Sequence, residues 1–232
     1  MIDLHGKFIV FDGTEGCGKS TQAELLRRKL EADGLRVLLV RDPGTTRIGE
    51  QIRAILLNPD HDEMRMRCEM LLYMAARAQM MAQTIRPALD DGMVVLSDRF
   101  ISSTLAYQLG GDGLTADEIR AVGNIAVGGR WPDLTVLLDM SAEASMDRVQ
   151  PKLLFKDAVD LVAKDRIERR PMEYHERVRA NYLAQAAADP ATYRVVRADR
   201  DKQAVHEDVV LAVMGCNPGI ENSDRVPKHL DE

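Results

Sequence analysis

Residues 7–20 read Lys7-Phe-Ile-Val-Phe-Asp-Gly13-Thr-Glu-Gly-Cys-Gly18-Lys19-Ser20. The apolar run 7–11 predicts a buried strand, and the residues from Lys19 onward predict a helix. Between them, the spacing G-x-x-x-x-G-K-[ST] is typical of a phosphate-binding loop, in which glycines allow backbone N–H groups to turn inward around phosphate oxygens. A glycine-rich turn without a ligand is the alternative, but the strand and helix on either side favour the phosphate loop.

The loop is expected to hold the phosphates of a nucleotide. Lys19 should reach the β- and γ-phosphates, and the Ser20 hydroxyl should ligate Mg²⁺. Cys17 is either a reactive thiol at a helix N-terminus or simply a small residue that the loop requires. The residues expected to bind this nucleotide are Gly13, Thr14, Glu15, Gly16, Cys17, Gly18, Lys19, Ser20 and Thr21.

Outward from this loop, strands alternate with helices. Helices are expected over residues 19–33, 49–57 and 63–89, and further short apolar strands over 35–40, 93–96, 134–138 and 193–196. Near-continuous apolar strands separated by helices are typical of a parallel sheet that is buried on both faces. We therefore expect an α/β fold in three layers, with a five-stranded parallel sheet flanked by helices.

Composition narrows the possible functions. The 232 residues include 31 Lys+Arg and 37 Asp+Glu, for a formal net charge of −6, which argues against general nucleic-acid or anionic-membrane binding. No apolar run is long enough to span a membrane, and the start of the chain does not resemble a signal peptide. Three scattered cysteines suit a reducing cytoplasm and exclude a disulfide framework. We expect one domain over 1–215 and a polar tail over 216–232.

The type of phosphate-loop protein can also be narrowed. A guanine-reading N-K-x-D motif is missing, because Ala163 stands where Asn would be required in the nearest string. Motor ATPases and helicases usually need longer chains. A short α/β chain with arginines after its strand ends favours phosphoryl transfer between two small nucleotides.

Four spaced segments carry a more specific signal. They are Phe11-Asp-Gly-Thr-Glu-Gly-Cys-Gly-Lys-Ser-Thr-Gln22, Arg41-Asp-Pro-Gly44, Asp98-Arg-Phe-Ile-Ser-Ser-Thr-Leu-Ala-Tyr-Gln108, and Asp165-Arg-Ile-Glu168 followed by Arg177-Val-Arg-Ala-Asn-Tyr182. With these segments, residues 7–215 resemble thymidylate kinases of the bacterial type. The resemblance implies a P-loop NTPase fold with a mobile lid at about 148–166, phosphorylation of dTMP to dTDP by ATP with Mg²⁺, and a homodimer formed through the Met-rich helix.

The resemblance also implies a thymine site. Tyr73 would stack on the base and Arg77, one helical turn later, would bond its carbonyl edge. Thr104 and Gln108 would read the pyrimidine edge, and Tyr107 would crowd the sugar 2′ position and so favour deoxyribose. The alternatives are a core aromatic at 73, a solvated charge at 77 and ordinary helix packing for the other three.

The phosphate end of dTMP is implied in the same way. Arg99 would clamp the dTMP phosphate, Asp98 would hold Mg²⁺ together with Ser20 or orient Arg99, and Glu15 would engage the sugar 3′-hydroxyl. Asp42 replaces the family's usual Glu and would face the phosphates, bracing the loop or the metal shell. A structural ion pair of Asp98 with Arg99 and a turn-forming role for Asp42 are the alternatives.

The lid departs most from the family. Arg148 fits the first lid arginine, but the stretch that follows is longer than in the family and has no arginine before Arg166. The catalytic set is therefore expected to be Lys19, Asp98, Arg99 and Arg148, with a mobile lid cation drawn from Arg148, Lys152, Lys156, Lys164 or Arg166. Two alternatives remain: a kinase of another nucleoside monophosphate or deoxynucleoside, and a catalytically silent nucleotide-binding protein.

Overall fold

The protein is built around a five-stranded sheet. The structure is a computed structural model that describes residues 3–149 and 165–215. All strand pairs are parallel, in the order β2-β3-β1-β4-β5. The strands are β1 (Phe8–Asp12), β2 (Val37–Arg41), β3 (Val94–Asp98), β4 (Leu134–Asp139) and β5 (Tyr193–Arg197). The expected five-stranded parallel sheet is thus confirmed, and each predicted strand end lies within two residues of the observed one.

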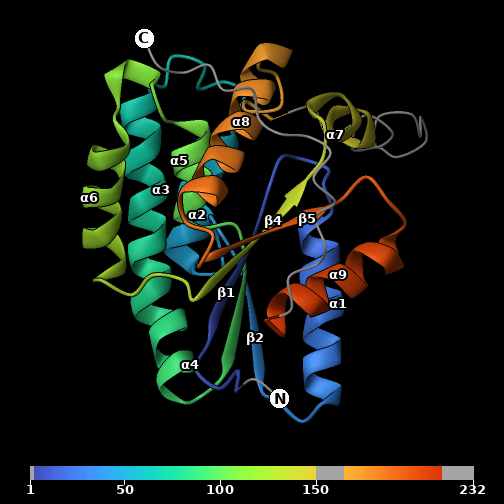
Figure 1. Ribbon diagram of the computed structural model, residues 1–232. Coiled ribbons are helices and arrows are strands. Elements are labelled where there is room, and N and C mark those ends of the chain that lie inside the picture. Colours follow the sequence, from blue (N-terminus) through green and yellow to red (C-terminus); the bar gives the residue numbers. More distant parts are fainter. Residues whose placement is uncertain (1–2, 150–164, 216–232) are drawn as a thin grey trace, which may run out of the picture.

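Helices cover both faces of this sheet, as Figure 1 shows. On one face lie α1 (Lys19–Ala32) and α9 (Lys202–Val213), which contact each other. The other face carries α3 (Met66–Met80), α5 (Ile101–Tyr107), α6 (Ala116–Val127) and α8 (Met172–Ala188). The remaining described elements are α2 (Arg47–Leu57), a π-helical turn (Met81–Ile85), α4 (Arg86–Asp90), a 3₁₀ turn (Gly111–Gly113) and α7 (Ala142–Val149).

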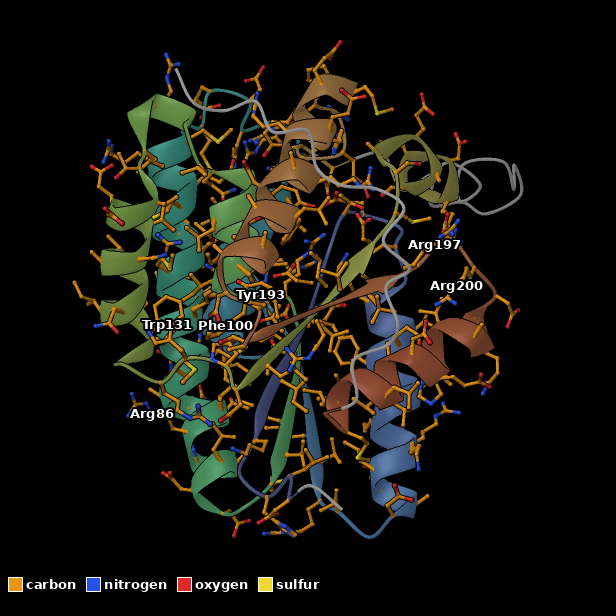
Figure 2. All side chains as sticks on the ribbon, in the orientation of Figure 1. Arg86, Phe100, Trp131, Tyr193, Arg197 and Arg200 are labelled. Atoms are coloured by element: carbon orange, nitrogen blue, oxygen red, sulfur yellow. The ribbon has the colours of Figure 1, made fainter. Side chains whose placement is uncertain are left out.

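The alternation of side chains along β1 divides the core between these two layers. Ile9 and Phe11 pack with α1 and α9, whereas Phe8 and Val10 pack with α3 and its neighbours. Phe100, labelled in Figure 2, meets Phe8 edge-on, with the ring centroids 4.9 Å apart. Every β1 side chain is buried, as the apolar run predicted.

The long helix expected over 63–89 is wrong in two details. It begins at Met66, because Arg65 is extended (φ −79°, ψ 151°), and it is interrupted by the π turn at Met81–Ile85. Pro87 accounts for the interruption, since it has no N–H to donate to the carbonyl four residues earlier. Hydrophobic periodicity does not reveal such a local change of helix type. The described residues between 101 and 213 contain five more α-helices, α5 to α9, whose bounds were not predicted.

Thr45 lies in the turn after β2, at a position whose backbone conformation is one that glycine usually adopts. Its φ is +68°, a left-handed conformation that a β-branched residue rarely adopts. The hydroxyl offsets this strain, because it accepts from the Arg41 N–H at 2.9 Å and donates to the Arg41 carbonyl at 3.0 Å. The turn after β2 therefore keeps its shape without a glycine.

The proposed lid and tail fall mainly beyond what the structure describes. Residues 150–164, with Lys152, Lys156 and Lys164, lie outside the described residues, and so does the tail 216–232. At the two edges of the expected lid, Arg148 lies in the last turn of α7, and Arg166 is also among the described residues. The expected single domain over 1–215 stays a prediction.

Candidate functional site

A cavity of about 530 Å³ opens at the carboxyl ends of the strands. Ligands of open α/β sheets bind at this edge, because the loops that leave the strands converge there. Gly13, Thr14 and Cys17 shape the loop but do not line the cavity. The other residues predicted for the catalytic set or for binding ATP or dTMP all do: Glu15, Gly16, Gly18, Lys19, Ser20, Thr21, Asp42, Tyr73, Arg77, Asp98, Arg99, Thr104, Tyr107, Gln108 and Arg148.

The phosphate loop requires glycine at its first position. Gly13 has φ +137°, and an added Cβ would lie 2.4 Å from the Leu138 carbonyl oxygen and 2.9 Å from Cys17 Sγ. Lys19, the first residue of α1, donates from Nζ to the carbonyl oxygens of Thr14 at 2.6 Å and Gly13 at 3.2 Å. The loop therefore wraps the lysine charge, and the N-terminus of α1 adds its dipole at the same point.

Cys17 is part of this packing. Burial raises the pKa of the Cys17 thiol above its ordinary value, although Lys19 opposes the shift. Its Sγ lies 3.6 Å from Lys19 Nζ, inside the loop. A buried thiol with a raised pKa is a poor nucleophile, so the structure favours the small-residue interpretation over the reactive thiol.

Ser20 and Asp98 come together across the sheet edge. Ser20 Oγ donates to Asp98 Oδ2 at 2.5 Å, which links the start of α1 to the end of β3. Hydroxyl and carboxylate oxygens are hard ligands of the type that Mg²⁺ prefers. Among the described residues, no three His, Cys, Asp or Glu side chains cluster in a way that could hold a metal ion.

Arg99 is at the centre of a second group of hydrogen-bonded side chains. Its Nη2 donates to Glu15 Oε1 at 3.0 Å and its Nη1 to the Gly13 carbonyl at 3.0 Å. Tyr107 OH donates to both Glu15 oxygens, at 2.7 and 2.8 Å. Arg99 has φ +72°, a strained conformation that is typical of functional sites. Burial alone would raise the pKa of the Glu15 carboxyl, but the charges of Arg99 and Lys19 hold it below its usual value.

A second arginine lies deeper, between α3 and α5. Arg77 is 1% exposed, so the alternative of a solvated helix charge is wrong. Its Nε donates to Asp42 Oδ2 at 2.5 Å and its Nη1 to Thr104 Oγ1 at 2.6 Å. Tyr73 lies beside it, with the guanidinium carbon 5.6 Å from the ring centroid. Asp42 therefore holds Arg77, and its bracing of the loop or the metal shell stays a prediction.

With this geometry in hand, comparison with known proteins is specific. A sequence model of the family described as thymidylate kinase matches residues 11–209. The chain belongs to the thymidylate kinase family. A thymidylate kinase of Pelotomaculum thermopropionicum is 47% identical over 209 residues, covering 90% of this chain and 93% of the relative. One from Nitratidesulfovibrio vulgaris is 44% identical over 206 residues, covering 89% and 95%.

A solved structure agrees with these sequence relatives. The crystal structure of thymidylate kinase from Ehrlichia chaffeensis superposes with a TM-score of 0.71 at 28% identity, covering 90% of this chain and 99% of that one. The resemblance stated from the four segments is confirmed, and so is the P-loop NTPase fold. None of the helices in the described part of the chain is long and apolar enough to cross a membrane.

The two arginines at the edges of the expected lid, Arg148 and Arg166, differ in their surroundings. Arg148, exposed at the end of α7, lines the cavity and donates from Nη1 to the Ala198 carbonyl at 3.1 Å. Arg166 is buried and does not line the cavity; it pairs with Glu69 and donates to the Leu56 carbonyl at 3.2 Å. Of the two, only Arg148 lines the cavity.

The predicted site residues did not include a buried carboxylate at the end of β1. Asp12 is fully buried and accepts from Ser102 Oγ at 2.5 Å, Ser103 Oγ at 2.7 Å and Tyr182 OH at 2.5 Å. It thereby ties β1 to α5 and α8 beneath Arg99. A signal was available, because a charged residue that ends an otherwise apolar strand just before a phosphate loop needs partners when it is buried.

Proposed function

We propose that the cavity binds ATP along the phosphate loop and dTMP between α3 and α5, and transfers the γ-phosphoryl group from ATP to dTMP, giving ADP and dTDP. Membership of the thymidylate kinase family supports this reaction. The observation that carries the residue assignment is the convergence of loop, Arg99 cluster and Arg77 cluster on one cavity.

The Arg77 side of the cavity suits the base. Tyr73 offers a ring for stacking, and Arg77, held by Asp42 and Thr104, offers N–H donors to a base carbonyl. Gln108 follows Thr104 by one helical turn, and the backbone N–H of Gln108 donates to the backbone carbonyl of Thr104 at 3.0 Å. These side chains give the cavity a donor and an amide at the edge where a pyrimidine would lie.

The Arg99 side suits the sugar and the phosphate. Arg99 has a planar fork that matches phosphate oxygens, and it lies beside the loop that would hold ATP. Glu15 would accept from the sugar 3′-hydroxyl, and the Tyr107 ring would occupy the space of a 2′-hydroxyl. The acceptor oxygen belongs to a phosphate that is already anionic at neutral pH, so the reaction needs no general base.

Phosphoryl transfer then depends on alignment and on positive charge around the moving group. Lys19 and Arg148 both line the cavity, and each would bring positive charge to a transferred phosphoryl group. Ser20 and Asp98 fit Mg²⁺ by their donor chemistry and their contact at 2.5 Å. Mg²⁺, when bound with ATP, would neutralise charge on the phosphate oxygens.

Tyr107 provides a test of sugar selectivity. Tyr107→Ala should lower the preference for dTMP over its ribo-analogue by about tenfold, since removing the ring opens the space for a 2′-hydroxyl. Tyr107→Phe keeps the ring and should keep the preference, although it releases Glu15. The ratio of kcat/KM for the two nucleotides measures this effect, and an unchanged ratio in the alanine variant contradicts the assignment.

A homodimer is also proposed. Four of the six large hydrophobic side chains exposed on the described residues, Ile48, Ile55, Leu71 and Ile125, lie on α2, α3 and α6. α3 contacts both of the other helices, so these side chains occupy neighbouring elements. Leu71→Lys should therefore convert a dimer to a monomer, while Leu211→Lys on α9 should not. Light scattering would measure the molecular mass of each variant. A monomeric unaltered chain would refute the proposal.

We place the reaction in the cytoplasm. Cys17 and Cys68 are free thiols, which suits a reducing compartment. Fractionation of cells that express the full chain would test this assignment.

The deciding experiment for the function is a coupled assay with ATP and Mg²⁺ across dTMP, dUMP, dCMP, dGMP and AMP. Conversion of dTMP well above the others, abolished by EDTA, is the expected result. Preference for another monophosphate would favour a different nucleotide kinase. ATP binding without transfer to any monophosphate would support a silent nucleotide-binding protein.

A further inference from the structure

Glu69 is a fully buried carboxylate in α3 that none of the expected roles uses. Its Oε2 pairs with Arg166 and accepts from Arg170 Nη2 at 2.8 Å. Its Oε1 accepts from Gln108 Nε2 at 2.6 Å. Glu69 therefore joins α3, the segment that precedes α8, and the end of α5.

This contact decides which way the Gln108 amide points. A carboxylate paired with two guanidinium groups offers acceptors only, so the NH₂ group of Gln108 must be the one that faces Glu69. The opposite end of the amide is then the carbonyl oxygen. Within residues 3–149 and 165–215, no protein group donates a hydrogen bond to this carbonyl oxygen of Gln108, and Gln108 lines the cavity. Gln108 thus presents an acceptor to a ligand.

The neighbouring arginine has the opposite polarity. Arg77 is donor-only and bonds Thr104, one turn before Gln108. The cavity wall therefore carries a donor next to an acceptor. The thymine edge carries the complementary pair, an O4 acceptor next to an N3–H donor, whereas cytosine carries an amino donor next to an N3 acceptor.

We propose that Glu69 is a positioning residue for base selectivity: it locks the Gln108 amide with its oxygen toward the pocket, so that the site accepts thymine and rejects cytosine. This inference rests on the proposed base site. Arg166 and Arg170 have a defined part in it, because they neutralise the buried carboxylate, whose burial alone would be costly. The arginine at the end of the expected lid thus serves the base pocket.

The test replaces Glu69 with Gln, which has the same shape but offers both donor and acceptor. The Gln108 amide can then flip, and a donor can face the base. The ratio of kcat/KM for dTMP over 5-methyl-dCMP, which share the methyl group and differ only in the pairing edge, should fall about 10- to 100-fold. The ratio for dTMP over dUMP, which share the pairing edge, should stay within about twofold.

Glu69→Asp separates polarity from packing. It keeps an acceptor-only group but loses a methylene, so a merely structural role makes it the worse variant, whereas the positioning role makes Glu69→Gln the worse one in the dTMP to 5-methyl-dCMP ratio. Melting temperatures confirm that each variant is folded, and Glu118→Gln, an exposed partner of Arg67, is the matched charge control.

Gln108→Ala distinguishes failure of this inference from failure of the base site. If Gln108→Ala lowers the edge-dependent ratio and Glu69→Gln does not, Glu69 is not a positioning residue and the site assignment stands. If Gln108→Ala leaves the ratio unchanged, the base site itself is misassigned. Equal loss of both ratios in Glu69→Gln also overturns the proposal, because it indicates general loosening of the pocket.

Discussion

Arg148→Ala should lower kcat about 10³-fold or more, because a cation that stabilises the transferred phosphoryl group is worth about 10³ to 10⁵ in rate. A loss of 10³ corresponds to about 4 kcal/mol of transition-state stabilisation. Arg148 lines the cavity from α7, whereas the other described lid arginine, Arg166, is occupied by Glu69. Since Arg148 is expected to act on the moving group, dTMP affinity should change by less than about threefold.

Single-turnover kinetics and titration calorimetry with dTMP would separate these two effects. Arg148→Lys keeps the charge but loses the planar fork, so its kcat should lie between those of the unaltered protein and the alanine variant. Arg28→Ala, on the exposed side of α1, controls for the loss of one arginine charge. A kcat preserved in Arg148→Ala would transfer the role to a lysine of segment 150–164.

Lys19→Ala should lower kcat/KM for ATP by about 10³-fold, again about 4 kcal/mol. Two losses combine. The ammonium no longer reaches the phosphates, and the carbonyl oxygens of Gly13 and Thr14 lose the donor that the loop wraps around. Because these carbonyls lie in the loop itself, we expect weaker ATP binding as well as slower transfer, in contrast to Arg148→Ala.

Lys29→Ala is the matched control for Lys19, because Lys29 lies on the same helix and pairs only with exposed Asp33. Steady-state kinetics with ATP varied at saturating dTMP, together with ATP titration, would measure both losses. Retention of ATP affinity and rate in Lys19→Ala would mean that this loop does not hold the triphosphate.

The sequence predicted best what is encoded locally. The strand at 7–11, the glycine loop and the start of α1 depend on residues that are neighbours in the chain, and the structure has all three. It predicted the long helix less well, because a single proline changes the hydrogen bonding near Met81–Ile85 without altering the hydrophobic pattern. Membership of the family could also be predicted from the sequence, because the four quoted segments place functional residue types at short, specific spacings.

Pairings between distant segments were not readable. Asp12 contacts Tyr182 and Glu69 contacts Arg166 and Gln108, and all of these partners come from separate elements. Arg166 shows the consequence. The sequence made it a candidate lid cation, but in the fold its guanidinium group pairs with the buried carboxylate of Glu69. A motif specifies which side chains are available, not which of them will be neutralised by others.

By itself, therefore, the sequence determined the phosphate loop, the parallel α/β sheet and the set of side chains proposed to bind two nucleotides, because strand, turn and helix formation depend on short-range patterns. Only the tertiary structure decided how those side chains are shared: Arg99 with Glu15, Arg77 with Asp42 and Thr104, Gln108 with Glu69. The packing of α3, α5 and α8 on the sheet sets these contacts, since hydrogen bonds require positions fixed to within a fraction of an ångström.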